Sequence, residues 1–359
     1  MLKRLFFWLT VFTSGIVPAA AAPFANPIDT PARASTMAAT SPMLGVAVAG
    51  ERVVAVGQRG HILVSKDGGK TWQQAKVPVS TDLVAVYFPS ETNGWAVGHG
   101  GVVLHSTDGG LTWVRQLEGK QAAKLAADYM GKHKDDPAFA QLVRQSEGQL
   151  ADAEMGALPP FLDVYFESET TGYVVGAFNR IFRTEDAGKT WHPWMARVDN
   201  PEELHFYAIR RSGSDLYLTG EQGMVWRLDA KENKFVRVPT GYKGTLFGLV
   251  GTERAVLAYG MNGTIFRSLD QGKRWEIVAN GSRAGINGGL VLGDNQFLLV
   301  NSAGELLLSN DQGASFRTLR LPNAMPAYFG ISAAKESGFV LSGSNGAQVI
   351  GMSAIDAKN

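Results

Sequence analysis

One eight-residue phrase recurs along the chain at a nearly constant interval. Its best copies read Ser/Thr-x-Asp-x-Gly-x-Thr-Trp, where x is any residue, and each copy closes on an aromatic residue. The steps between successive closing residues are 41, 78, 44, 40 and 41. A period of about 40 residues indicates a fold built by repeating one supersecondary unit, and the long step marks an insertion. The closing residues are Trp72, Trp113, Trp191, Phe235, Trp275 and Phe316.

A pair of turn residues precedes each phrase at a fixed distance. The first of the pair lies eight residues before the phrase, and the second follows it by three. Glycine, with Asn as its substitute, is what a tight reversal needs where φ is positive. The first members are Gly57, Gly98, Gly176, Gly220, Gly260 and Asn301, and a seventh pair, Gly343 and Gly346, has no phrase after it.

Short apolar or alternating runs flank these turns and predict strands. Each repeat holds three strands, the phrase, and a fourth strand that starts at the closing aromatic residue. Four strands in about 40 residues, repeated seven times, predict an all-β fold, a seven-bladed β-propeller of four-stranded blades. We expect residues 22–359 to form this propeller, with segment 22–41 supplying the outermost strand of the last blade.

The phrase is an Asp-box, also called a BNR repeat, and we assign it a structural role. The carboxylate can accept backbone N–H bonds across the turn that joins strands three and four, while the aromatic residue covers the hairpin. Calcium binding is the alternative, but the further oxygen ligands of a calcium loop are missing at the required spacing. We therefore expect no metal and no cofactor. The carboxylates are Asp67, Asp108, Asp186, Asp270 and Asp311.

Composition removes several classes of function. The chain has no Cys, which excludes disulfides, thiol catalysis and Cys-ligated metals. The formal net charge is +1, whereas a nucleic-acid-binding protein normally has a strong basic excess.

The first 21 residues resemble an export signal. Lys3 and Arg4 precede an apolar run that ends near Val17, and small residues follow. This order is typical of a secretory signal peptide, with cleavage near Ala21, and the run is too short to span a bilayer. We expect a periplasmic, monomeric protein with no membrane span after cleavage.

Residues 118–160 form the insertion and have helical rather than strand periodicity. Leu125 and Tyr129 share one helical face, and Phe139 and Leu142 share another. We expect a two-helix hairpin between blades two and three, on the face that carries the paired turn residues. It either packs on its own propeller or acts as a lid or docking element.

With these motifs, best kept at Val56–Trp72 and Val97–Trp113, the chain resembles the photosystem II stability/assembly factor-like family, most closely its non-photosynthetic bacterial members. The resemblance covers essentially the whole mature chain. It implies a non-enzymatic protein that binds a membrane-protein complex of the envelope, such as a transporter, as an assembly or accessory factor.

The alternative is a glycoside hydrolase of the sialidase type, since these enzymes also carry Asp-boxes. Such a site needs an Arg cluster, a Tyr nucleophile with a Glu base, and an Asp acid. On the inner strands we find Arg210 and Arg211, and we expect Asp163 and Glu167 to be solvated carboxylates. We therefore favour a non-enzymatic function.

The loops beside the insertion are the candidate partner-binding residues. They differ in chemistry from repeat to repeat, which is expected either for a binding surface or for simple exposure to water. The candidates are Arg59, His99, Phe178, Arg180, Glu221 and Asn262, together with Leu125, Tyr129, Phe139 and Leu142 of the insertion.

Overall fold

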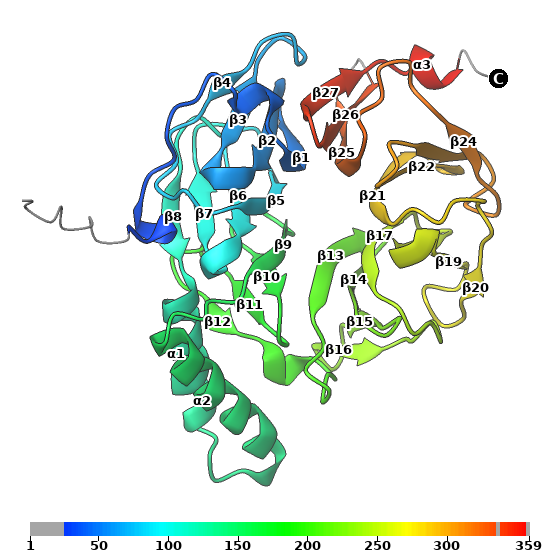
Figure 1. Ribbon diagram of the computed structural model, residues 1–359. Coiled ribbons are helices and arrows are strands. Elements are labelled where there is room, and N and C mark those ends of the chain that lie inside the picture. The colour runs from blue at the N-terminus through cyan, green and yellow to red at the C-terminus, as the bar shows by residue number, and fades with distance from the viewer. Residues whose placement is uncertain (1–24, 335–337, 357–359) are drawn as a thin grey trace, which may run out of the picture.

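Seven antiparallel sheets surround a central axis in the computed structural model (Figure 1). The structure describes residues 25–334 and 338–356. In every sheet the strands lie in chain order, so that each sheet is one up-and-down blade. The predicted seven-bladed β-propeller is confirmed, and the expected signal peptide, with its cleavage near Ala21, lies outside the described residues.

The first three blades contain β1 (Met43–Ala49), β2 (Arg52–Gly57), β3 (Ile62–Ser65) and β4 (Gln73–Gln74); β5 (Leu83–Tyr87), β6 (Gly94–Gly98), β7 (Val103–Ser106) and β8 (Val114–Leu117); and β9 (Phe161–Phe166), β10 (Gly172–Gly176), β11 (Ile181–Thr184) and β12 (His192–Pro193).

The remaining blades contain β13 (Phe206–Ser212), β14 (Asp215–Gly220), β15 (Val225–Asp229) and β16 (Lys234–Arg237); β17 (Leu246–Gly251), β18 (Val256–Gly260), β19 (Ile265–Ser268) and β20 (Glu276–Ile277); β21 (Ile286–Gly293), β22 (Gln296–Asn301), β23 (Leu306–Ser309) and β24 (Arg317–Leu319); and β25 (Tyr328–Ala334), β26 (Gly338–Gly343) and β27 (Gly346–Ile350). A short helix, α3 (Ser353–Asp356), follows.

The Asp-box carboxylates bind the turns between the third and fourth strands. Asp108 accepts hydrogen bonds from the N–H groups of Leu111 and Thr112, both at 2.9 Å, and from the hydroxyls of Ser106 and Thr112. Equivalent bonds occur at Asp67, Asp186, Asp270 and Asp311. The bond from the Thr71 hydroxyl is the largest influence that lowers the pKa of Asp67 to about 2.

The N-terminal segment does not form the fourth strand of the last blade, which was the sequence-based expectation. Within the described residues this blade has three strands, β25, β26 and β27. The backbone of the segment finds partners in the connection between β4 of blade one and β5 of blade two instead: the N–H of Ala32 donates to the Val77 carbonyl, and the N–H of Ser80 donates to the Pro27 carbonyl. Its two short 3-10 helices are η1 (Pro27–Asp29) and η2 (Ala38–Thr40), and η2 lies against β27.

The insertion is a helical hairpin, as predicted, made of α1 (Gly119–Gly131), the 3-10 turn η5 (Pro137–Phe139) and α2 (Ala140–Glu154). Glu118 caps α1 by accepting from the N–H groups of Lys120 and Gln121. In Figure 1 the hairpin extends outward from the ring beside β12.

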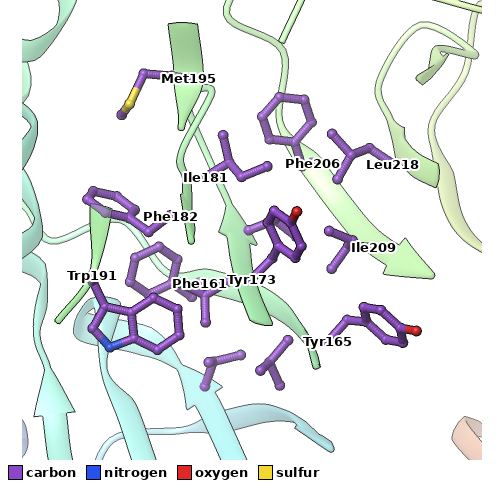
Figure 2. Packing of buried hydrophobic residues seen from close by; sticks show 14 of the residues in the cluster. Phe161, Tyr165, Tyr173, Ile181, Phe182, Trp191, Met195, Phe206, Ile209 and Leu218 are labelled. Atoms are coloured by element: carbon purple, nitrogen blue, oxygen red, sulfur yellow. The ribbon is translucent and has the colours of Figure 1, made fainter. Parts of the chain in front are cut away.

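The largest buried cluster joins the hairpin to blades two, three and four. Ala122, Ala126 and Met130 of α1 are fully buried in it. Figure 2 shows the aromatic part of this cluster, in which the rings of Phe161 and Phe182 pack edge to face with their centroids 5.8 Å apart. The hairpin is therefore part of the hydrophobic core, and replacing it with a flexible linker would expose that core.

Candidate protein-binding face

The turns between the second and third strands of the blades form one face of the ring, which we call the hairpin-bearing face. Gly100 and Gly101 in the turn of blade two lie against Gly119, where α1 begins. Four of the predicted binding residues are exposed on these turns, and Glu221 is half-buried there. The exposed ones are Arg59, His99, Phe178 and Asn262.

Phe178 has the least expected backbone conformation on this face. Its φ is 58°, in the left-handed region that bulky side chains rarely adopt. The corresponding turn residues in blades one, four and five are Arg59, Gln222 and Asn262, which also have positive φ. The turn thus imposes the left-handed conformation, and in blade three it is imposed on an aromatic residue that is 48% exposed.

The helical hairpin holds this turn in place. The side-chain amides of Gln145 and Gln149 on α2 both donate to the Phe178 carbonyl, at 3.0 and 2.9 Å. The neighbouring Asn179 is buried and donates to Gln145. Strained residues persist where the surrounding structure over-determines them, often at functional sites. Here α2 supplies that support.

Phe178 belongs to a short row of side chains with His205 and Glu221. The rings of Phe178 and His205 meet edge to face with centroids 4.5 Å apart. Glu221 accepts from the backbone N–H of His205 at 2.9 Å and lies 3.8 Å from the imidazole Nδ1. The row combines an exposed aromatic surface with a carboxylate, which is a combination suited to recognising a protein side chain.

Arg180 is not a surface residue, which corrects the sequence-based prediction that grouped it with the exposed loop. It is 1% exposed, and it donates to the Pro159 carbonyl and to Gln149 of α2. Burial lowers its pKa to about 10, and its Nη2 has no partner among the described residues. Arg180 therefore ties the hairpin to blade three.

The hairpin residues predicted to bind a partner separate into two groups. Leu125 and Tyr129 on α1 are 37% and 36% exposed. Phe139 and Leu142 are partly buried and pack against the main core, so they contribute mainly to the attachment of the hairpin. The structure does not bring Leu125 and Tyr129 onto the same surface as Phe178: they line a groove at the outer edge of blade three.

The axial channel, of 340 Å³, is lined by the inner strands and has a feature that sequence reasoning missed. Each inner strand has a β-bulge near its start, and a bulge redirects one side chain. All seven bulged residues line the channel: Leu44, Val84, Leu162, Tyr207, Phe247, Asn287 and Phe329. The signal was available in the sequence. At the start of each inner strand a residue that is buried in the core is followed directly by the bulged residue, and in six of the seven strands both are apolar or aromatic, where strict alternation would place a polar residue second.

The charged groups near the channel are paired with one another. Asp163 is buried, not solvated as expected, and it accepts from Arg210 and from the N–H of Ile209. Arg211 binds Glu167 and the Tyr165 hydroxyl. Both arginines are therefore engaged by carboxylates of this chain, and neither is left to bind a substrate carboxylate as a sialidase-type site requires.

Residues 25–334 and 338–356 contain no cluster of His, Asp and Glu that could hold a metal ion. None of the helices in these ranges is long and apolar enough to cross a membrane.

Comparison with known proteins agrees with this architecture. A structure described as YCF48 bound to D1 peptide superposes with a TM-score of 0.62 at 18% identity, over 91% of this chain and 97% of that one. YCF48 from Cyanidioschyzon merolae gives 0.60 at 15% identity, over 89% and 96%. The WD40 propeller domain of Doa1 gives 0.59 at 8% identity, over 88% and 93%. At these identities the likeness establishes the fold.

No curated protein sequence matches the chain. Residues 36–126 and 141–286, more than half of the chain, match the family model described as photosynthesis system II assembly factor YCF48. The chain therefore belongs to the YCF48 family of photosynthesis system II assembly factors.

Proposed function

We propose that this chain is an exported, non-enzymatic propeller that binds a protein partner through its hairpin-bearing face. Its role is that of an assembly or accessory factor for a membrane-protein complex of the envelope, such as a transporter, and it acts in the periplasm as a monomer. Membership of the YCF48 family supports a role in assembly, and the related structure that contains a D1 peptide supports a protein ligand.

The observation that carries the proposal is the conformation of Phe178. An aromatic residue in the left-handed region costs about 1–2 kcal/mol relative to an ordinary conformation. Two glutamines of the insertion hold it there while 48% of the residue stays exposed. The fold is therefore less stable than it would be with Gly or Asn at this position, and in return an aromatic ring is exposed on the surface. A binding role for the ring accounts for this loss of stability.

A glycosidase function has weaker support. The channel arginines are paired internally, with Arg210 on Asp163 and Arg211 on Glu167. Incubation of the purified protein with a fluorogenic sialoside should release no fluorophore above the rate of a buffer control. Release that depends on Arg210 or Tyr165 would favour the enzyme.

The test of the binding proposal compares two exposed apolar residues at opposite ends of the blades. Phe178→Ser on the hairpin-bearing face should reduce the yield of the in-cell crosslink between the tagged protein and its membrane-fraction partner. Leu269→Ser, in the Asp-box of blade five, is the matched control because Leu269 is 56% exposed. The proposal would be contradicted if the two variants gave the same crosslink yield, or if only Leu269→Ser gave a lower yield than the wild type.

A further inference from the structure

A groove of 660 Å³ lies between α1 and the outer edge of blade three. Its blade side comes from the Asp-box and β12 of blade three, together with the end of β8 of blade two. Phe178 lies in the turn between β10 and β11, at the opposite end of β11 from the Asp-box. The groove and the hairpin-bearing face are therefore separate surfaces. The groove is lined chiefly by Leu117, Leu125, Tyr129, Trp191 and Pro193, with Lys124, Lys132 and Lys189 among its charged residues.

The apolar side chains of the groove come from both walls. Leu125 and Tyr129 are four residues apart on α1 and so lie on one face of the helix. They remain more than a third exposed, although other α1 residues such as Ala126 and Met130 are fully buried in the core. Trp191 closes the Asp-box on the opposite wall and is 4% exposed. Exposed apolar side chains beside a groove are typical of a site that receives a partner.

The charge of the groove defines the kind of partner. Lys124 forms an ion pair with Asp128 at 2.9 Å, so these two charges offset each other. Lys132, which directly follows α1, and Lys189 on blade three form no salt bridge with any residue in the described ranges, although the charge of Lys189 helps to lower the pKa of the Asp186 carboxyl in the same Asp-box. Among the residues that line the groove, positive charges therefore outnumber negative ones, and they come from both walls.

We propose that this groove is a second docking site, which binds a partner segment that has an apolar side chain flanked by carboxylates. The apolar side chain packs against Leu125 and Tyr129, where it loses contact with water. The carboxylates pair with Lys132 and Lys189, which fixes the register of the segment and makes binding dependent on salt. The site is independent of the hairpin-bearing face, so it stands or falls separately from the function proposed above.

The experiment measures the fluorescence polarisation of a fluorescein-labelled peptide, DEWED, with the full-length mature protein. We expect saturable binding that weakens with added salt. The peptides KRWRK, with its charge reversed, and DESED, without the apolar side chain, should bind at least about tenfold more weakly. No measurable binding of DEWED, or tighter binding of KRWRK, would overturn the proposal.

The variants locate the binding. Lys132→Glu combined with Lys189→Glu should raise the dissociation constant of DEWED at least about tenfold, and Tyr129→Ser should also raise it. Lys70→Glu combined with Lys273→Glu is the matched control, because Lys70 and Lys273 hold the position of Lys189 in the Asp-boxes of blades one and five. An equal loss in the control would refute the site. A dimer in sedimentation velocity that Leu125→Ser abolishes would assign the groove to a second copy of the chain and also refute the proposal.

Discussion

Asp108→Ala removes the acceptor at the centre of the second Asp-box. Four hydrogen bonds end on this carboxylate, two from backbone N–H groups and two from hydroxyls. The hydroxyl and the N–H of Thr112 lie near the surface and can turn to water, so the loss is smaller than four full bonds, whereas Ser106 is 1% exposed and its hydroxyl loses its acceptor. Leaving the remaining donors without an acceptor costs roughly 1–3 kcal/mol. We expect the free energy of unfolding to fall by that amount.

Urea unfolding followed by tryptophan fluorescence measures this change, since the chain has 8 Trp. The control is Asp229→Ala in the degenerate fourth-blade copy, where the carboxylate accepts from two N–H groups and from no hydroxyl. This variant should lose less stability than Asp108→Ala. A midpoint for Asp108→Ala equal to that of the wild type, with an unchanged slope, would refute the structural role of the box.

Three further predictions concern the hairpin attachment, the strained turn and pH. Arg180→Glu, which places an acid in a buried site built from carbonyl and amide oxygens, should destabilise the fold by roughly 3–5 kcal/mol in urea unfolding, and a loss below 1 kcal/mol would place Arg180 at the surface after all. Phe178→Asn should leave the stability unchanged or raise it by up to about 1 kcal/mol while reducing partner crosslinking, because Asn tolerates positive φ, and a marked loss of stability would contradict the strain argument. The pKa values of Asp67 and Asp270 are lowered to about 2 in the fold, so their stabilising contribution is present above the unfolded pKa near 4 and is lost as pH falls toward 2. The melting temperature in thermal unfolding should therefore fall between about pH 4 and pH 2. A constant melting temperature over this interval would count against the carboxylate hydrogen bonds.

The fold could be predicted because its determinants are local and repeated. The turn glycines and the Asp-box each specify a tight reversal within a few residues, and each recurs often enough to fix the blade count. The hairpin could be predicted in the same way from its helical periodicity. The path of residues 25–42 could not, since it depends on which distant carbonyls, such as that of Val77, are available to the segment.

The burial of Arg180 could have been inferred by aligning the repeats strictly. Arg180 directly follows the second turn residue, Asn179, and therefore corresponds to His61 and Val102, which are 6% and 0% exposed. It does not correspond to Arg59, which lies one residue before that turn residue. The partners of Arg180 on α2 could not be inferred, because they come from an insertion outside the repeat.

The most direct test of the central claim is site-specific photocrosslinking in intact cells. A photoreactive phenylalanine analogue replaces Phe178 on the hairpin-bearing face or Leu269 on the Asp-box face, one at a time. The account predicts a discrete crosslink to a membrane-fraction protein from position 178 and none from position 269. A crosslink from position 269 alone would place the partner on the opposite face and contradict the account.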